Sequence, residues 1–382
     1  MNDLLIQNVR IYQDGVFTPG EILCQEGKIA KIAPDIDAPE GTPPLDGTGR
    51  RLVPGFMDIH THGAAGVDVN AASAQELGKI GRFFASQGVT GWLASVLTDT
   101  REQTLWCIGE VKKAMEHPEG APLLGVHLEG PFLASAYKGA MPEELLQTGN
   151  AALLREYLGA GEGAVRYVTV SPEVPGVVEM IEEVSGEVTV AIGHSGADYE
   201  ISRRAIAAGA KAATHTGNAM RLLHQHEPAI WGAVLEDDRV FCEVICDGRH
   251  LHPGTVRLIL KTKGMERVVA ITDSIMAAGL PDGPYKLGVN DVIVQDGDAK
   301  LPNGTRAGST LTLINALKNL VAFTSLPVEQ LLPLLTRNPA QLLGLSEQKG
   351  AIAPGMDADL VLLGEDLTVD ATIAGGKVVY RA

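Results

Sequence analysis

The chain has 382 residues, of which 45% are hydrophobic and 20% are charged. This composition is typical of a folded protein and excludes a disordered chain, and the length suggests one large domain with a small one beside it. The net charge of −16 would repel a phosphate backbone or an anionic membrane, so we expect no nucleic-acid partner and no membrane partner.

Short apolar runs with glycine and aspartate turns fill the N-terminal 50 residues, as in residues 4–15 and 20–34, and they show no helical period. The opening MNDLLIQNVR lacks the basic and apolar regions of a signal peptide. No apolar run approaches the roughly 18 residues of a membrane span. We therefore expect short strands at the N-terminus and a cytoplasmic protein.

Eight apolar runs follow, and each ends at a polar or glycine-rich corner. They cover residues 52–60, 88–95, 122–130, 164–173, 187–195, 210–218, 240–248 and 267–274, and the run at 210–218 is the weakest. Apolar residues at helical spacing lie between several of them, for example in residues 73–88, 141–161 and 198–210. Apolar strands that alternate with amphipathic helices predict a parallel sheet covered on both faces.

An open doubly wound sheet would show the same alternation, so the position of the polar residues decides. Histidines and carboxylates end the runs of five different strands, and only a barrel brings all of these ends to one mouth. We predict an α/β fold with a TIM-like (β/α)8 barrel over residues 51–349. The tail from 350 to 382 returns to short strands, so residues 1–50 and 350–382 are predicted to form one small β-domain.

Five potential metal ligands stand where apolar runs end. His60 and His62 are spaced H-x-H, so both imidazoles point to the same face of a strand. Glu129, His194 and His215 each stand where a run meets a glycine-containing corner. Neutral imidazoles with a carboxylate suit a divalent transition metal, above all zinc or ferrous iron, and a position left free for water makes such a site catalytic.

Asp273 follows the last apolar run. Its carboxylate could ligate the metal, accept a proton from water or cap the helix that follows, and the residues alone leave these alternatives open. A base beside metal-bound water indicates hydrolysis, because the metal lowers the pKa of that water to about 7.

The cysteines form no C-x-x-C pair. The strand between the last two would hold their side chains too far apart for a disulfide. We expect four free, buried thiols: Cys24, Cys107, Cys242 and Cys246.

Motifs along the whole chain carry a resemblance to a known family. They are PGFMDIHTHG (54–63), HLEGPF (127–132), GHS (193–195), ATHTGNAM (213–220), CDGRHLHP (246–253), ITDSIMAAG (271–279), AGSTLTL (307–313), NPA (338–340) and GMDADLVLL (355–363). Together they resemble the amidohydrolase superfamily and, within it, the N-acetylglucosamine-6-phosphate deacetylase family. The resemblance implies a barrel with a β-sandwich built from both termini. It also implies deacetylation of N-acetylglucosamine 6-phosphate to glucosamine 6-phosphate and acetate, by a homodimer.

For the metal site, the resemblance implies that Glu129, His194 and His215 hold the primary ion. His60 and His62 would help to bind a second ion, as in some members of the family. The expected cofactor is thus one or two divalent ions per subunit, zinc or iron.

For the substrate, the resemblance implies that Asp273 is the general acid/base and that His250 contacts the sugar. Asn218 and the backbone of Ala219 would contact the phosphate end. The expected partner is therefore a small N-acetyl amino sugar in its phosphorylated form.

Three motifs depart from the family pattern. Met141 stands where the family carries a histidine that polarises the acetyl carbonyl, and a thioether donates no hydrogen bond. His226 replaces an arginine that reaches the neighbouring subunit's phosphate, and a mostly neutral imidazole cannot grip phosphate with two prongs. Thr216 and Gly217 replace a Leu-Tyr pair, which enlarges that side of the pocket.

Two arginines near these motifs could compensate, Arg221 and Arg249. We hypothesise that one of them binds the anionic end of the substrate, the alternative being an ordinary solvated charge.

Two further functions stay open. One is the same chemistry on another N-acyl substrate, such as N-acetylgalactosamine 6-phosphate, an unphosphorylated N-acetyl amino sugar or an N-acyl amino acid. The other is a non-catalytic barrel that binds a sugar or a partner protein.

Overall fold

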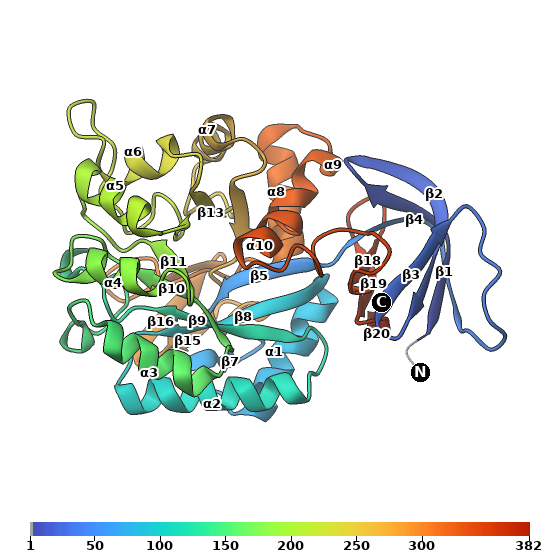
Figure 1. The fold of residues 1–382 in the computed structure, drawn as a ribbon, viewed down its shortest axis with the longest axis horizontal. Coiled ribbons are helices and arrows are strands. Elements are labelled where there is room, and N and C mark those ends of the chain that lie inside the picture. Colours follow the sequence, from blue (N-terminus) through green and yellow to red (C-terminus); the bar gives the residue numbers. More distant parts are fainter. Residues whose placement is uncertain (1–2) are drawn as a thin grey trace.

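The computed structural model describes residues 3–382, and over this range the chain forms a barrel with a separate β-sheet at one side (Figure 1). The barrel sheet of the described residues has eight parallel strands in the order β14-β13-β12-β11-β10-β9-β8-β5. These are β5 (Phe56–Thr61), β8 (Val89–Leu97), β9 (Leu123–Glu129), β10 (Val165–Val170), β11 (Thr189–Ile192), β12 (Ala212–Ala213), β13 (Phe241–Ile245) and β14 (Val268–Ile271).

Backbone hydrogen bonds beyond β14 close this sheet into a barrel. Asp273 N donates to His60 O over 2.8 Å, and His62 N donates to Ser274 O over 2.7 Å. The predicted (β/α)8 barrel is therefore confirmed, and the weak run at 210–218 contains the shortest of its strands, β12.

The helices that alternate with the barrel strands cover the outside of the sheet. They are α1 (Ala74–Ser86), α2 (Arg101–Glu116), α3 (Ala151–Gly161), α4 (Val177–Val184), α5 (Tyr199–Ala208), α6 (Ala229–Glu236), α7 (Pro253–Lys263) and α8 (Leu313–Thr324), followed by the short α9 (Val328–Leu331) and α10 (Arg337–Leu342). Side-chain caps fix the first residues of two of the predicted helices. Ser73 and Glu76 form a capping box at α1, and Asp198 caps α5 by accepting a hydrogen bond from Ile201 N.

The helix predicted over residues 141–161 is wrong in its first half, because α3 begins only at Ala151. Asn150 caps α3 by accepting a hydrogen bond from Leu153 N, so the helix cannot extend backwards through it. Gly149 packs so closely on Gly176 that a Cβ there would lie 2.2 Å from the Gly176 carbonyl carbon. Met141 instead lies at the barrel mouth, and the residues after it form a loop with one short 3-10 helix at Glu143–Leu145.

Both ends of the chain lie in one seven-stranded sheet among the described residues, in the order β20-β19-β18-β4-β1-β2-β3. Its strands are β1 (Leu4–Gln13), β2 (Val16–Gln25), β3 (Lys28–Ala33), β4 (Pro44–Pro54), β18 (Leu360–Leu363), β19 (Val369–Ala374) and β20 (Lys377–Arg381). The β4–β18 pair joins the two ends, and Ile6, Leu52 and Leu360 belong to an apolar cluster separate from the barrel core. The predicted union of the termini is confirmed, whereas the boundaries at residues 50 and 350 stay a prediction.

A small sheet that the sequence analysis did not predict stands between β14 and α8. It consists of β15 (Gly283–Leu287), β16 (Asn290–Gln295) and β17 (Asp298–Lys300), and a shorter hairpin, β6 (Gly63–Ala64) with β7 (Val67–Asp68), follows β5. Leu287 and Val292 pack with Leu97 and Met141 in a cluster of their own. This cluster fixes the small sheet and the Met141 loop beside the barrel mouth.

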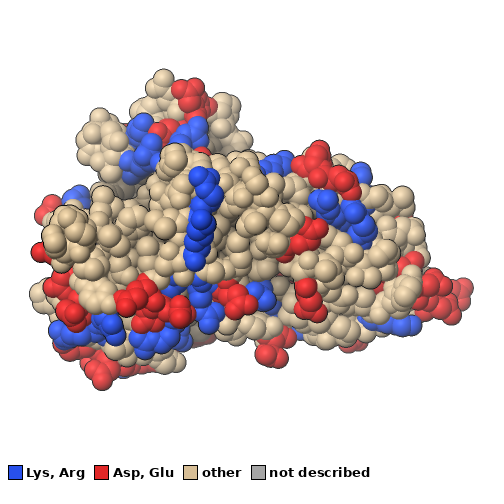
Figure 2. Space-filling view, turned by 90° about the horizontal axis from the view of Figure 1, so that it is seen from above, with Lys and Arg blue, Asp and Glu red and all other residues tan. Residues whose placement is uncertain are grey.

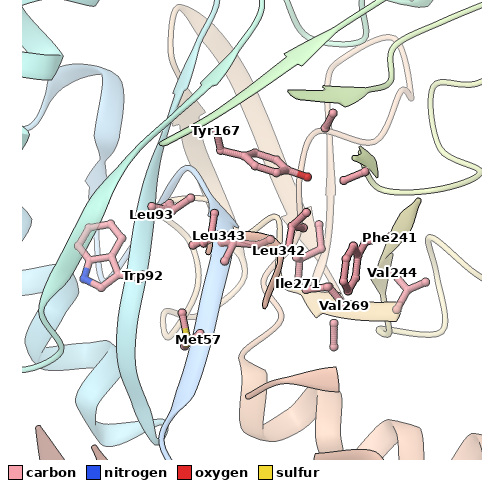
Figure 3. Close-up of a cluster of buried hydrophobic side chains, with 14 of the residues drawn as sticks. Met57, Trp92, Leu93, Tyr167, Phe241, Val244, Val269, Ile271, Leu342 and Leu343 are labelled. Atoms are coloured by element: carbon pink, nitrogen blue, oxygen red, sulfur yellow. The ribbon is translucent and has the colours of Figure 1, made fainter. Parts of the chain in front are cut away.

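The barrel rests on a continuous apolar core. Figure 3 shows part of it, with Trp92 and Leu93 of β8 near Met57 of β5, and Phe241 and Val244 on β13. Close packing of this kind holds strand ends in fixed positions, which a site built from several strands requires.

The cysteines, the surface charges and the helices of the described residues can be compared with what the sequence predicted. Cys24, Cys107, Cys242 and Cys246 are free and buried, as predicted. On the face shown in Figure 2, Lys and Arg side chains are scattered among acidic and uncharged ones. Of the helices in residues 3–382, none combines the length and apolar character that crossing a bilayer would need.

Candidate metal centre and active site

The five predicted ligands converge at the carboxyl ends of the barrel strands. Glu129 Oε1 lies 3.1 Å from His194 Nε2 and 3.3 Å from His215 Nε2, and these two nitrogens are 3.0 Å apart. On the other side of Glu129, Oε2 lies 3.2 Å from His62 Nε2, and Oε1 lies 3.4 Å from His60 Nε2. All five side chains are buried. Two potential metal sites therefore share Glu129.

Backbone conformation brings these side chains inward after the strands end. His194, His215 and Asp273 each stand two residues beyond a strand, and their φ angles of 47°, 28° and 50° are left-handed. Residues other than glycine rarely adopt this region, so the surrounding structure maintains it at a cost. Such strain at all three positions is typical of a functional site.

Hydrogen bonds at the outer nitrogens decide which imidazole atom faces the site. His60 Nδ1 lies 3.0 Å from Glu243 Oε2, His62 Nδ1 lies 3.0 Å from Ser95 O, and His194 Nδ1 lies 2.8 Å from Tyr137 O. Because these oxygens can only accept, each Nδ1 carries the proton. Nε2 is then the atom left to bind a metal ion or a second proton.

The donor set fits a divalent metal. Ligands about 2.1 Å from one ion and separated by tetrahedral or octahedral angles lie roughly 3.0–3.4 Å from each other, which matches the distances around Glu129. His60 Nε2 is buried without a hydrogen-bond partner in the described residues, as expected of an atom placed for a ligand. The chain can thus hold a divalent ion at Glu129.

The buried histidines and carboxylates of the site shift each other's pKa values. Burial alone would lower the pKa of His62, but its hydrogen bonds with Asp273 and Glu129 outweigh burial and raise the pKa to about 9. Burial would raise the pKa of Glu129, yet the charge of His60 and the hydrogen bonds from His194 and His215 hold it well below its usual range. A metal ion therefore replaces protons at these nitrogens when it binds.

Asp273 belongs to the same group of side chains. Its Oδ1 lies 3.3 Å from His62 Nε2 and 3.6 Å from His60 Nε2. Burial acts to raise its pKa, but the hydrogen bond with His62 and the charge of His60 lower it overall, so the carboxylate is ionised at neutral pH. Asp273 is placed to exchange a proton with a molecule bound at this end of the site.

Glu243 is a site residue that the sequence analysis missed. It is fully buried on β13, and Oε2 accepts from both His60 Nδ1 and His215 N, each over 3.0 Å. Tyr167 donates to Oε1 over 2.6 Å. A charged residue inside the apolar run VFCEVIC was the available signal, because a buried carboxylate needs partners.

A cavity of about 390 Å³ opens above these ligands, and several predicted substrate residues line it. They are Met141, Asn218, Ala219 and His250, and the predicted acid/base Asp273 lines the cavity with them. His250 Nδ1 donates to Asp247 Oδ2 over 2.7 Å, which fixes the ring. This volume is in the range of small-molecule sites.

Three other predicted residues do not line the cavity. Arg221 pairs with Glu227, Arg249 donates to the carbonyl of Asp296, and His226 is exposed. Substrate contacts by these three residues stay a prediction. The cavity instead contains Arg306, for which the sequence offered no recognised motif.

Comparisons with known proteins agree with this site. Residues 51–379 match the amidohydrolase family. An N-acetylglucosamine-6-phosphate deacetylase of Lysinibacillus sphaericus is 33% identical over 98% of this chain and 97% of that protein. An N-acetylgalactosamine-6-phosphate deacetylase of Escherichia coli O157:H7 is 33% identical over 96% of each protein.

A solved structure resembles the whole chain. It is a mutant of N-acetyl-D-glucosamine-6-phosphate deacetylase from Mycobacterium smegmatis in complex with N-acetyl-D-glucosamine-6-phosphate, with a TM-score of 0.91 and 33% identity over 99% of this chain and 99% of that one. The family match and these near-full-length relatives cover both the barrel and the terminal sheet. The chain belongs to the N-acetylglucosamine-6-phosphate deacetylase family of the amidohydrolase superfamily, a family of hydrolases that act on C–N amide bonds.

Proposed function

We propose that this protein is a metal-dependent deacetylase that converts N-acetylglucosamine 6-phosphate to glucosamine 6-phosphate and acetate. The observation that carries the proposal is the convergence of Glu129, His194 and His215 beside Asp273 at the floor of one cavity. The substrate class is supported by relatives of near-full length that are named for this activity, and by the Mycobacterium smegmatis complex.

Glu129, His194 and His215 hold the primary ion in this proposal, and His60 and His62 hold a second one together with Glu129. The imidazole and carboxylate donors suit zinc or iron. A bound ion of this kind supplies Lewis-acid polarisation of the acetyl carbonyl and lowers the pKa of water. Met141 contributes no hydrogen bond to that carbonyl, because a thioether is not a donor.

Asp273 is the general acid/base of the proposed reaction. Its Oδ1 takes a proton from the attacking water and returns it to the nitrogen that leaves as the amine. Two features support this role: the carboxylate is ionised at neutral pH, and it faces the ligands and the cavity at once.

His250 and Asn218 orient the sugar in this proposal. Asp247 holds the Nδ1 proton of His250, so the ring presents Nε2 to a sugar oxygen. Asn218 and the backbone of Ala219 line the cavity beside His215, where they can contact the far end of the substrate.

We also propose a cytoplasmic homodimer. The loop after Met220 supports a subunit contact, because Leu222 and Leu223 are 63% and 49% exposed beside His226. Exposed leucines next to each other are typical of a surface that a partner covers. In a dimer, His226 would reach the neighbouring subunit's site.

Acetate release tests the proposal. The protein loaded with zinc or with ferrous iron is incubated with N-acetylglucosamine 6-phosphate, N-acetylgalactosamine 6-phosphate, N-acetylglucosamine and an N-acetyl amino acid. We expect the highest kcat/KM on the first compound. A preference for the galactosamine ester, the activity for which the Escherichia coli relative is named, would move the assignment to that sugar. Absence of turnover on all four would favour the non-catalytic sugar-binding barrel.

A further inference from the structure

Arg306 is the only lysine or arginine among the described residues that line the active-site cavity. The other cationic candidates near the motifs, Arg221 and Arg249, are engaged with Glu227 and with the Asp296 carbonyl. Arg306 is therefore the guanidinium available to a negatively charged group of a molecule bound in this cavity.

Asp298 holds the Arg306 guanidinium by one edge. Arg306 Nε donates to Asp298 Oδ1 over 2.9 Å, and Nη2 donates to Oδ2 over 3.2 Å. Nη1 has no hydrogen-bond partner within residues 3–382. Since five N–H groups of a guanidinium lie in a fixed plane, fixing one edge aims the remaining donors.

The charge of this group is positive overall. Asp298 also pairs with Lys300, whose Nζ lies 2.8 Å from Oδ2, so one carboxylate is shared by two cations. Burial would raise the pKa of Asp298, but hydrogen bonds from Arg306 and Lys300 lower it. The carboxylate thus stays ionised and positions Arg306. Because one carboxylate faces two cations, the group of three side chains keeps a net positive charge.

The chain connects Arg306 directly to the catalytic floor. Ser309 N donates to Asp273 O over 2.7 Å, and a Cβ on Gly308 would lie 3.7 Å from Asp273 Oδ1. Arg306 is two residues before Gly308, which is at most roughly 7 Å of extended chain. A substrate that reaches Asp273 with its amide is therefore within reach of the arginine with a second group.

We propose that Arg306 is a specificity-determining residue that binds an oxyanion on the substrate from within the same subunit. The proposal rests on the proposed amide hydrolysis and names a further feature of the substrate. The oxyanion is either the 6-phosphate of the sugar or a carboxylate on the acyl group. A guanidinium can bind two oxygens of either group with two parallel N–H donors. The imidazole at position 226 lacks the two-donor fork of a guanidinium, and Arg306 supplies that fork together with a permanent charge.

Two pairs of substrates, each differing in one anionic group, test this proposal and identify the oxyanion. The first pair is N-acetylglucosamine 6-phosphate with N-acetylglucosamine, and the second is N-succinylglucosamine with N-butanoylglucosamine. kcat/KM is measured for the metal-loaded wild type, Arg306→Met and Arg306→Lys. Arg249→Met is the comparison variant, because it removes the rival guanidinium that the sequence analysis considered for the same anion and that lies outside the cavity.

We expect Arg306→Met to lower kcat/KM about 10- to 100-fold on the charged member of one pair and by less than about 3-fold on its uncharged member. Arg306→Lys restores part of the loss, since it keeps the charge without the fork. A merely structural clip between Arg306 and Asp298 would lower all four values together. Equal losses within both pairs, no loss at all, or a charge-selective loss confined to Arg249→Met would overturn the proposal.

A binding measurement separates this inference from the proposed function. Calorimetry gives Kd for glucosamine 6-phosphate, glucosamine, succinamate and butanamide on the same variants, so each charged compound has an analogue without the anionic group, and the measurement needs no turnover. If the wild type hydrolyses none of the four substrates, the proposed function fails. The inference about Arg306 then stands on a charge-selective rise in Kd in Arg306→Met, and it fails if Kd does not change.

Discussion

At the scale of single residues, the chemistry depends on which atom of each histidine carries a proton. Acceptors at Nδ1 fix this choice for His60, His62 and His194, so that Nε2 faces Glu129 in every case. Sequence spacing predicted that these three side chains meet Glu129 and His215 at one place, because all five stand at the ends of apolar runs. It could not predict the acceptors, since two of the three are backbone carbonyls that any residue could supply.

Replacing Asp273 by asparagine separates proton transfer from metal binding. Asparagine keeps the shape of the side chain but accepts no proton at neutral pH. We expect kcat for acetate release to fall about 10²- to 10⁴-fold while metal content, measured by mass spectrometry of the purified protein, stays near the wild-type value. Turnover close to that of the wild type would remove Asp273 from the proposed mechanism.

Glu243 is expected to act through the ligands that it orients. In Glu243→Gln, an amide NH₂ would face the donors at His60 Nδ1 or His215 N, and we expect metal affinity to fall about 10- to 100-fold. Tyr167→Phe is the matched control, because it removes only the hydrogen bond to Oε1. Competition with a fluorescent zinc chelator measures both affinities. Equal affinity in Glu243→Gln and the wild type would contradict a positioning role.

At the scale of elements, the segment between β17 and α8 links the small sheet to the barrel mouth. Gly308 has a φ of 60°, and a Cβ there would lie 2.5 Å from Ile275 Cγ2 and 2.7 Å from Asp273 O. Only glycine fits so close a contact. The segment therefore holds Asp273 and Arg306 in a fixed relation.

Gly308→Ala is expected to displace this segment. Because a misplacement of about 1 Å can cost two orders of magnitude in rate, we expect kcat/KM to fall at least about 10-fold. Gly304→Ala is the control: its φ of 87° is equally strained for alanine, but a Cβ there meets nothing within 4 Å. Similar kinetics for both variants would show that the packing at Gly308 does not position the site.

Periodicity predicted the barrel elements well. Buried parallel strands appear as continuous apolar runs, and apolar residues recur every three to four positions in the helices between them. The strands β15 to β17 escaped prediction because they are short and alternate between exposed and buried positions outside the barrel repeat. Arg306 was missed for a related reason: its place in the cavity comes from how the small sheet packs on the mouth, which no local pattern encodes.

At the scale of the whole molecule, the proposed metal centre brings distant parts of the chain together. From His60 to His215, the ligands come from four barrel strands or the residues just after them. Without a cation, buried carboxylates and imidazoles depend on protons for compensation. An ion that binds the folded state alone stabilises it by RT ln(1 + L/Kd), where L is the free ion concentration, so the gain grows with the logarithm of its affinity.

Metal loading is therefore expected to raise Tm. With zinc at about 1,000 times its Kd, the native state gains about 4 kcal/mol, and for a chain of this length we expect Tm to rise by roughly 5 °C above the chelator-treated protein. Scanning calorimetry measures the difference. Glu129→Gln, which removes the shared ligand, should show a much smaller rise, and an identical rise in that variant would place the stabilising ion elsewhere.

The most direct test of the account is anomalous diffraction from crystals of the zinc-loaded protein, recorded on both sides of the zinc absorption edge. We predict a peak roughly 2.0–2.2 Å from the carboxylate of Glu129 and from Nε2 of His194 and His215, with any second peak beside His60 and His62. Zinc bound only at other residues, with no peak at Glu129, would contradict the proposed metal centre and the hydrolysis built on it.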